Sequence, residues 1–225
     1  MKIVSYNIFS HSQEKIDSLL NMGADVYIIP EIHSAAQIAL PDEYDFFRFS
    51  TPAESSKGLG VICKKNCNFS VPEWYSRRHK YILPLCSGDL LLIAMWPTIT
   101  EANKNMGYPQ IALEAIKYYS SFFNGKRVVL SGDFNCFVGQ KDENPKRGTL
   151  LQIVEFLSLY KIYSLYHKQT YEDFGKESST TFHWQFKEEQ HFFLDYTFTN
   201  IEDVKYKLVE WDRKFSDHHA QIIEF

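Results

Sequence analysis

Polar side chains that could bind a cation stand where several predicted strands end. Asn7 closes the first strand, and Glu31 comes just after the second, next to Pro30. Asp133 and Asn135 follow a third apolar run. In open α/β sheets, ligands bind beyond the carboxyl ends of the strands, so groups far apart in the sequence can meet there. The sequence therefore predicts that these side chains converge on one site.

A second group of ionisable residues lies in the last part of the chain. Asp195 interrupts the otherwise apolar run 191–196, and Asp217 and His218 come directly before the last predicted strand. A carboxylate with apolar neighbours on both sides is expected to be partly buried, and a buried charge needs a partner. His218 is the natural partner for Asp195.

This set of donors is typical of a site for a hard cation. Carboxylate and amide oxygens without cysteine ligands suit Mg²⁺ or Mn²⁺ better than zinc. The chain has no pair of histidines at H-x-x-x-H spacing, and the Cys63/Cys67 pair lacks a second ligand pair at zinc spacing. Each residue taken singly also has an ordinary structural interpretation, because Asn, Asp and Glu near strand ends often form turns or cap helices.

The composition fits a globular chain and excludes several classes of protein. With 225 residues, of which 44% are hydrophobic and 23% charged, the chain is neither disordered nor fibrous. No repeat or long linker divides it, so we expect one domain over residues 1–225. The net charge of −4 gives no global positive field toward nucleic acid, so a polyanionic substrate must meet a local patch or a bound cation.

Cysteine usage and apolar runs predict the compartment. The 4 cysteines are expected to be buried, reduced thiols. The chain opens directly on a strand-like run, and its longest apolar run, 90–95, is far short of the roughly 20 residues of a membrane-spanning helix. We therefore expect a cytoplasmic protein with no membrane association and no stable protein partner.

Short strands and helices alternate in the predicted secondary structure. The spacing of apolar residues predicts helices over 13–20, 108–123 and 149–159. Strands are predicted over 2–8, 25–29, 44–49, 59–63, 80–85, 90–95, 126–130, 161–166, 181–186, 191–199, 204–209 and 219–225. The economical arrangement is one α/β domain built on two sheets, with helices outside.

The polar motifs on these elements resemble those of a known superfamily. In chain order they are KIVSYN (2–7), ADVYIIPE (24–31), SGDFN (131–135), LDY (194–196) and SDH (216–218). Together they resemble the endonuclease/exonuclease/phosphatase superfamily, which includes exonuclease III-like and pancreatic-type deoxyribonucleases, inositol phosphatases and neutral sphingomyelinases. The resemblance spans nearly the whole chain. It implies a four-layer α/β sandwich, with two packed, mainly antiparallel or mixed β-sheets flanked by helices, and Mg²⁺-dependent hydrolysis of a phosphate ester.

The resemblance also implies which residues hold the metal. Carried over by position, Glu31 would bind Mg²⁺ (or Mn²⁺) with Asn7 beside it. Asp217 would lie near the metal, as a ligand or through a water. One departure from the family pattern falls here, because Pro30 stands where members usually have a glutamine before the metal-binding glutamate. That exchange removes a polar side chain and a backbone donor near the site.

A second set of residues would carry the catalytic chemistry. By the same resemblance, Asp133 would position or deprotonate the attacking water, and Asn135 would hydrogen-bond the phosphate. His218 would contact a non-bridging phosphate oxygen, oriented by Asp195. This agrees with what attack on a phosphate diester requires, namely an aligned water and positive charge near the equatorial oxygens.

Several weaker candidates for substrate contact remain. Trp96 stands where members usually have His or Tyr, and it offers only an indole N–H donor, so it either packs in the core or presents a stacking face for a base. The proton for the leaving oxygen must then come from elsewhere, with Tyr108, Arg77 or a metal-bound water as candidates. Tyr108 begins a predicted helix whose N-terminus favours anions. His183 lies in a segment that members place near substrate.

Three functions follow from these residues. The leading one is a metal-dependent phosphodiesterase that acts as a nuclease on DNA or RNA. Abasic-site repair is not expected, because Phe193 replaces the arginine of the exonuclease III-type W-R-L-D-Y pattern. The second is a phosphatase or phosphodiesterase of a small phosphorylated metabolite or lipid head group. The third is a non-catalytic nucleotide-binding module with the same fold, against which the retained set of charged residues argues.

Overall fold

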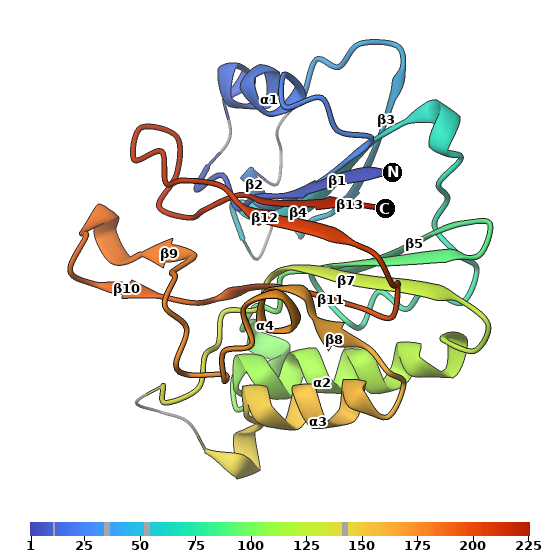
Figure 1. The fold of residues 1–225 in the computed structure, drawn as a ribbon. Helices are drawn as coiled ribbons and strands as arrows, with labels where there is room; N and C mark the ends of the chain where they lie inside the picture. The colour runs from blue at the N-terminus through green and yellow to red at the C-terminus, as the bar shows by residue number, and fades with distance from the viewer. Residues whose placement is uncertain (11, 34–36, 52–54, 141–143) are drawn as a thin grey trace.

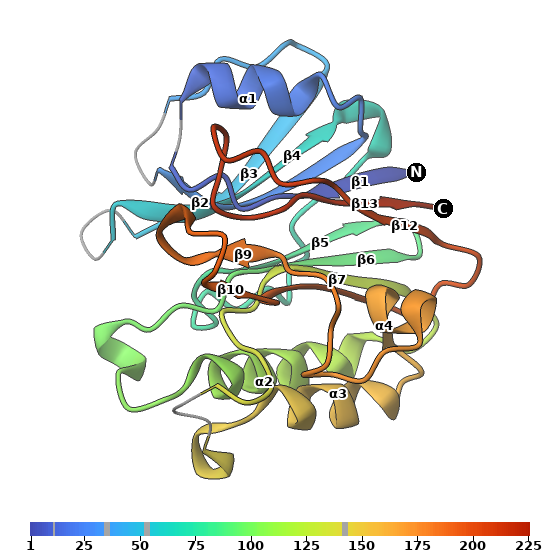
Figure 2. The same ribbon diagram turned by 60° about the vertical axis from the view of Figure 1, so that its left-hand side comes forward.

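Two β-sheets pack face to face, and helices cover their outer faces. The structure is a computed structural model that describes residues 1–10, 12–33, 37–51, 55–140 and 144–225. Helix α1 (Gln13–Leu20) covers the first sheet, and helices α2 (Tyr108–Tyr119) and α3 (Leu150–Ser158) cover the second (Figure 1). The same order of layers is seen in Figure 2. This is the α/β sandwich that the sequence predicts, and the expected fold class is confirmed.

The first sheet has the strand order β12-β13-β1-β2-β4-β3. Its strands are β1 (Lys2–Ser5), β2 (Val26–His33), β3 (Tyr44–Phe49), β4 (Lys57–Lys64), β12 (Lys205–Leu208) and β13 (Gln221–Glu224). Strands β1 and β2 are parallel, whereas the other neighbours are antiparallel. The first and last strands of the chain are thus partners at the centre of one sheet.

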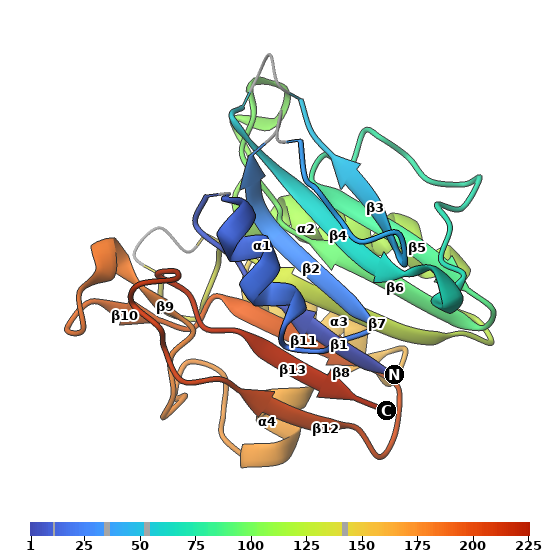
Figure 3. The same cartoon turned by 90° about the horizontal axis from the view of Figure 1, so that it is seen from above.

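The second sheet has the strand order β5-β6-β7-β11-β8. Its strands are β5 (Ile82–Ser87), β6 (Leu90–Met95), β7 (Arg127–Asp133), β8 (Tyr163–Ser164) and β11 (Asp195–Thr199). Only β6 and β7 are parallel among these pairs. A separate hairpin of β9 (Phe182–His183) and β10 (His191–Phe192) projects beyond the edge of the sandwich (Figure 3).

The helices begin where their sequences predict. The Oγ of Ser12 accepts a hydrogen bond from the backbone N–H of Lys15 and caps α1. At α3, Thr149 and Gln152 form a reciprocal capping box, each side chain bonding the other's backbone N–H. Short 3₁₀ turns cover Lys65–Cys67, Glu101–Asn103, Ser120–Phe122, Pro145–Arg147 and Trp184–Phe186. Every helix of the described residues is too short or too polar to cross a bilayer.

Apolar side chains from both sheets fill one core. Ile3 and Ile28 of the first sheet belong to the same buried cluster as Ile93 and Val129 of the second. Their burial is the dominant favourable contribution to the sandwich. All 4 cysteines are free, two of them buried and two half-buried. The cytoplasmic location stays a prediction.

Several predicted elements differ from the structure, among them the strand expected over 181–186, which is reduced to β9 and a following 3₁₀ turn, and three more differences are informative. The strand expected over 161–166 shrinks to β8, and the chain turns at once into α4 (Leu165–Thr170), where Ser164 Oγ hydrogen-bonds Nδ1 of His167. The strand expected over 191–199 divides into β10 and β11. The division falls where Oγ1 of Thr181 accepts the backbone N–H groups of both Leu194 and Asp195, which removes them from strand pairing.

The third difference concerns the strand that Pro30 was expected to end. Strand β2 continues to His33, and its register with β4 shifts between Pro30 and Ile32. Glu31 is the extra residue of this β-bulge and has a left-handed backbone, φ 62°. A proline is tolerated at a bulge because the ladder is interrupted there, and a bulge re-aims the side chain it carries.

Gly132 lets β7 approach β6 beside the candidate site. Its φ is 148°, and a Cβ atom at this position would lie 1.9 Å from the carbonyl oxygen of Met95. We expect Gly132→Ala to lower the free energy of unfolding by at least about 3 kcal/mol, from overpacking combined with backbone strain. Gly88→Ala is the control, since Gly88 has φ 57° but open space around its Cα. Equal urea midpoints for the two variants would contradict the prediction.

Candidate active site

Strand register brings the predicted polar residues to one end of the sandwich. Asp133 ends β7 and is the direct cross-strand partner of Asp195, which begins β11. Ser5 near the end of β1 pairs with Gln221 at the start of β13, so the residues after β1 meet those before β13. The structure thus gathers all of the residues assigned to metal binding and catalysis: Asn7, Glu31, Asp133, Asn135, Asp195, Asp217 and His218.

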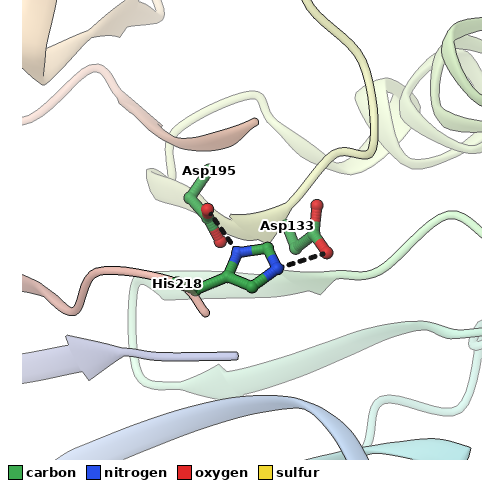
Figure 4. Close-up of side chains that lie close together, drawn as sticks. All are labelled: Asp133, Asp195 and His218. Carbon is green, nitrogen blue, oxygen red and sulfur yellow. Dashed lines mark hydrogen bonds and ion pairs between the residues drawn. The ribbon is translucent and has the colours of Figure 1, made fainter. Parts of the chain in front are cut away.

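His218 lies between two buried carboxylates (Figure 4). Its Nδ1 is 2.8 Å from Oδ2 of Asp195, and its Nε2 is 3.9 Å from Oδ2 of Asp133. All three residues are at most 3% exposed, and their ligand-type atoms lie within 4.8 Å of one another. The pairing of Asp195 with His218 is the one expected from the sequence.

The charges around His218 favour its protonated form. Burial alone would lower the pKa of the imidazole, but the carboxylates of Asp195, Asp133 and Asp217 outweigh burial and raise this pKa to about 10. Nδ2 of Asn7, 3.2 Å from Nε2, favours an unprotonated Nε2 instead. Several negative charges act more strongly on a buried ring than a single amide dipole, so the imidazolium form prevails. A protonated ring has no free lone pair, so in this state His218 acts as a donor, while the ligand-type atoms of the triad lie close enough together to hold a metal ion once the ring is deprotonated.

Asp133 is the opposite case, a carboxyl group whose surroundings raise its pKa and make its carboxylate more basic than that of an ordinary aspartate. Burial raises its pKa, the positive charge of His218 lowers it, and the charges of Asp195 and Glu31 raise it further. Its oxygens are fixed in place, since Oδ2 accepts from Nδ2 of Asn7 at 3.0 Å and Oδ1 accepts from the backbone N–H of Asn135 at 2.8 Å. The result is a rigid carboxyl group whose pKa lies well above its usual range.

Ser216 and Asn7 join the two chain segments that carry the site. The hydroxyl of Ser216 donates to the carbonyl oxygen of Asn7 at 2.6 Å and accepts the backbone N–H of His218 at 3.1 Å. The side-chain oxygen of Asn7 accepts the backbone N–H of Phe9. These bonds lock the loop before β13 onto the end of β1, which fixes the imidazole relative to Asp133.

Glu31 and Asp217 face the same pocket as His218. The bulge in β2 carries Glu31, whose side chain is 16% exposed and ion-paired with the ammonium group of Lys57. Burial raises the pKa of Asp217, His218 lowers it, and Glu31 raises it again. Oxygen donors that repel one another electrostatically are those that a bound cation stabilises, so Glu31 and Asp217 fit Mg²⁺ or Mn²⁺.

Lys57 is a site residue that the sequence analysis does not find. It opens β4 opposite His33, and it reaches Glu31 because the bulge turns the glutamate toward it. Its ammonium also lies 5.2 Å from the ring centroid of Phe9. No sequence motif marks Lys57. Its pairing with Glu31 depends on the strand register at the β-bulge, so the lysine could have been predicted only if the bulge had been predicted first.

The pocket beside these groups has a volume of about 1060 Å³. Its polar part holds Glu31, Lys57, Asn135, Asp217 and His218, and its other walls are largely aromatic. The remaining lining residues are Phe9, Tyr108, Phe137, Gln140, Phe182, Trp184, Gln190, Phe192 and Leu194. A charged floor with aromatic walls suits a ligand that has both an anionic and a flat apolar part.

Tyr108 and Asn135 lie at the pocket with donors available. Tyr108 begins α2, and burial, followed by the charges of Asp133 and Glu31, raises the pKa of its hydroxyl, so the group keeps its proton. Asn135 has a left-handed backbone, φ 54°, and its Nδ2 donates to the carbonyl oxygen of Pro97 at 3.2 Å. That bond leaves the second amide hydrogen of Asn135 for a ligand.

The structure places three of the substrate-contact candidates outside the pocket, and for Trp96 it agrees with the core-packing alternative. Trp96 is only 4% exposed and packs edge-on against Tyr81 in the core, so it presents no stacking face to a base. Arg77 is exposed and places its guanidinium 4.9 Å from the ring centroid of Phe49, away from the residues that line the pocket. His183 is 7% exposed and stacks on Trp211 rather than facing the pocket.

His183 does not face the pocket, because its strand neighbour Phe182 occupies the position at the site. Successive side chains of a strand point to opposite faces. In β9, Phe182 bridges to His218 with ring centroids 4.6 Å apart, which turns His183 the other way, toward Nε2 of His219 at 3.0 Å. The segment is near the site, as the sequence suggests, but a different side chain faces it.

Solved structures provide the comparison with known proteins, since no family model and no curated protein sequence matches the chain. The endonuclease domain of TRAS1, a telomere-specific non-LTR retrotransposon, is 15% identical over 99% of this chain and 96% of that one, with a TM-score of 0.64. An AP endonuclease from Leishmania major is 10% identical, with 99% and 86% covered and a TM-score of 0.72. The Xenopus laevis APE2 catalytic domain is 16% identical, with 100% and 91% covered and a TM-score of 0.64.

These matches cover almost the whole chain at sequence identities that show likeness of fold alone. The layers and the two mixed sheets agree with that likeness. The chain has the fold of the endonuclease/exonuclease/phosphatase superfamily.

Proposed function

We propose that the protein is a Mg²⁺-dependent phosphodiesterase that cleaves nucleic acid. The observation that carries this proposal is the imidazole of His218, held by Asp195 at 2.8 Å and facing a pocket that also contains Glu31 and Asp217. A positively charged donor beside a cation-binding pair is suited to stabilising the transition state of phosphoryl transfer.

Glu31 and Asp217 would hold Mg²⁺, with Asn7 next to them. When bound, the ion would supply positive charge to the phosphate oxygens and orient the scissile group. Asn7 contributes from the protein side as well, since its Nδ2 donates to Oδ2 of Asp133 at 3.0 Å and so holds the proposed base in place. Mn²⁺ is expected to substitute, because it accepts the same oxygen donors.

Asp133 is the proposed base. Its raised pKa brings the carboxylate toward the range in which a general base works near neutral pH, and its two hydrogen bonds hold it still. Asp133 takes a proton from water as the new bond from oxygen to phosphorus forms and the ester bond to the leaving oxygen breaks. Asn135 donates its second amide hydrogen to the phosphate.

His218 and Tyr108 would supply the two remaining donors. The imidazolium of His218 donates from Nε2 to a non-bridging phosphate oxygen, while Asp195 holds Nδ1. Of the side chains considered as donors to the leaving oxygen, Tyr108 lines the pocket and Arg77 does not. We therefore assign that role to Tyr108, whose pKa is raised by burial and which keeps its proton until the ester bond breaks.

Nucleic acid is the substrate class that the pocket supports best. A volume of about 1060 Å³ exceeds what one small phosphate ester needs, and the aromatic walls match flat bases. The similar solved structures include an AP endonuclease and a retrotransposon endonuclease domain. A non-catalytic module would gain nothing from keeping buried charges that are costly to leave unpaired.

The experiment is a cleavage panel with purified protein. Labelled single- and double-stranded DNA and RNA, together with a set of phosphomonoesters, are incubated with Mg²⁺ or Mn²⁺, and with EDTA as the control. We expect metal-dependent cleavage of nucleic acid and none with EDTA. Cleavage of monoesters alone would replace the nuclease proposal with the small-molecule phosphatase, and inactivity on every substrate would overturn the assignment as an enzyme.

A further inference from the structure

A row of aromatic rings starts at the catalytic imidazole and leads away from it along the pocket. Phe182 lies against His218 with ring centroids 4.6 Å apart and meets Trp184 edge-on at 6.2 Å. A second pair of rings in the pocket lining is formed by Phe192 and Phe137, whose ring centroids are 4.8 Å apart. All four aromatic residues line the pocket, so a ligand at His218 would have π-faces next to it.

The outer members of this wall are exposed to solvent. Trp184 is 51% exposed and Phe9 is 40% exposed, although both line the pocket. A tryptophan indole is a large apolar group that is normally well buried. Two such rings held open beside a catalytic imidazole indicate a contact surface for an apolar, flat ligand.

Residues in and next to these exposed rings have left-handed backbones. Gln185 and Phe186 have φ values of 52° and 59°, and Phe9 has φ 53°, a conformation that bulky residues rarely adopt. Phe186 packs edge-on against Phe9 with ring centroids 5.0 Å apart, which joins the hairpin to the loop after β1. Strained segments of this kind cluster where a surface must be preorganised for a ligand.

The loop of Phe9 is also tied directly to the proposed catalytic group. Its backbone N–H donates to Oδ1 of Asn7 at 3.0 Å, and Nδ2 of the same side chain donates to Asp133 at 3.0 Å. The amide of Asn7 therefore links the loop that carries Phe9 to the proposed base, Asp133. A base stacked on Phe9 would then be held at a fixed position relative to the scissile bond.

The charges near the pocket favour a ligand with few phosphate contacts. Among the residues that line it, Lys57 is a cation already paired with Glu31. A smaller adjoining cavity shares Tyr108 and Phe137 with the pocket and adds Arg147. A double helix is held mainly through many cationic contacts to its phosphates, and the described residues that line this surface offer few of them on a chain with net charge −4.

We propose that the substrate is an unpaired nucleotide strand, whose phosphate lies at His218 and whose base stacks on Trp184 and Phe9. Bases inside a duplex already stack on their neighbours, so only an unpaired base can use these rings without first being unstacked. The side-chain amides of Gln140 and Gln190 line the same pocket and can meet the edge of that base. This inference rests on the proposed function and names its substrate class.

Binding of a fluorescent strand tests the inference without relying on turnover. A short single-stranded DNA carrying 2-aminopurine is titrated with wild-type protein in EDTA, and its RNA counterpart is a second arm. Stacking on Trp184 is expected to quench the fluorescence, and Trp184→Ala is expected to weaken binding by about 5-fold or more and remove the quenching. Tyr171→Ala is the matched control, because Tyr171 is 92% exposed but lies outside the residues that line the pocket.

Two further measurements extend the test. The same strand annealed to its complement is expected to bind at least about tenfold more weakly. The plot of log affinity against log salt is expected to have a shallow slope, about −1 to −2, because few phosphates are contacted.

The inference is overturned if Trp184→Ala binds and quenches like wild type, or if the duplex binds as tightly as the single strand. If nucleic acid is cleaved but either of these results is obtained, the substrate class alone is wrong. If wild type neither binds nor cleaves any strand, both the inference and the proposed function fail.

Discussion

His218→Gln is expected to lower the turnover of phosphodiester cleavage at least ~100-fold while the protein stays folded. Loss of one preorganised donor to a developing charge has this magnitude in enzymes. His218→Ala should lose as much activity, but it would leave the buried carboxylates of Asp133 and Asp195 without the positive charge of the imidazole, which costs about 3–5 kcal/mol of stability. Glutamine retains a donor for Asp195 but has no positive charge.

The measurement is kcat on the best nucleic-acid substrate, together with near-ultraviolet circular dichroism of each variant. The chain offers a matched control in a second buried histidine–carboxylate pair, since Nε2 of His167 lies 3.1 Å from Oε1 of Glu177. His167→Gln breaks a comparable pair outside the pocket, so it should lose stability and keep turnover. Equal kcat for wild type and His218→Gln would show that the imidazole has no part in the reaction.

The pH dependence of the same residue has a definite sign. The folded-state pKa of His218 is raised to about 10 from its ordinary 6.5, mainly by Asp195 against the effect of burial. Its charged interactions therefore contribute fully to stability below about pH 6.5 and are lost as the pH rises toward 10. The stability difference between wild type and His218→Gln should shrink over this range, and Asp195→Asn should move the alkaline limb of kcat to lower pH.

Much of the fold follows from local sequence signals. The helix expected over 13–20 and the strands expected over 44–49 and 90–95 have those bounds in the structure. Each has an unambiguous period of apolar residues and a clear start or stop, such as the Ser12 cap. The strand prediction for 161–166 was wrong because a two-residue strand and the start of a short helix share one apolar run. Periodicity cannot separate the two at that length.

The convergence of the polar residues could be predicted for a different reason. Asn7 follows β1, Glu31 lies in the bulge near the end of β2, and Asp133 ends β7. The carboxyl ends of these strands share one edge of the sandwich, so topology gathers the three residues. Asp195 was expected to pair with His218 because a carboxylate in an apolar run needs a counter-charge, and the structure has that pair at 2.8 Å.

The sequence could not show which side chains of these segments face the pocket, because side-chain direction depends on tertiary contacts. Trp96 follows a strand at the correct edge, but packing against Tyr81 turns it into the core. Phe182 rather than His183 meets the site because a single bridge to His218 sets which face of β9 is inward. Both outcomes depend on contacts between distant segments, which no local pattern encodes.

Glu31→Gln is expected to weaken Mn²⁺ binding by at least about tenfold and to reduce kcat/KM at least ~100-fold. A carboxylate is replaced by a neutral amide of similar shape, so the loss reports the charge that holds the cation. Mn²⁺ binding is followed by the electron paramagnetic resonance of the free ion, which reads affinity independently of turnover. Unchanged affinity in Glu31→Gln would place the cation elsewhere.

Lys57→Met should shift Mn²⁺ affinity in the opposite direction. The ammonium of Lys57 pairs with Glu31. It therefore competes with a metal cation for that carboxylate, and its positive charge repels the cation. Two unit charges about 4 Å apart interact by about 1 kcal/mol in water and about 4 kcal/mol near a protein surface, which predicts binding tighter by about 5-fold or more. Lys64→Met is the matched control, because Lys64 is also on β4 and pairs with Asp25, a residue that does not line the pocket. Weaker Mn²⁺ binding in Lys57→Met would mean that the lysine supports the cation site instead of competing with it, and the electrostatic account of Glu31 would then fail.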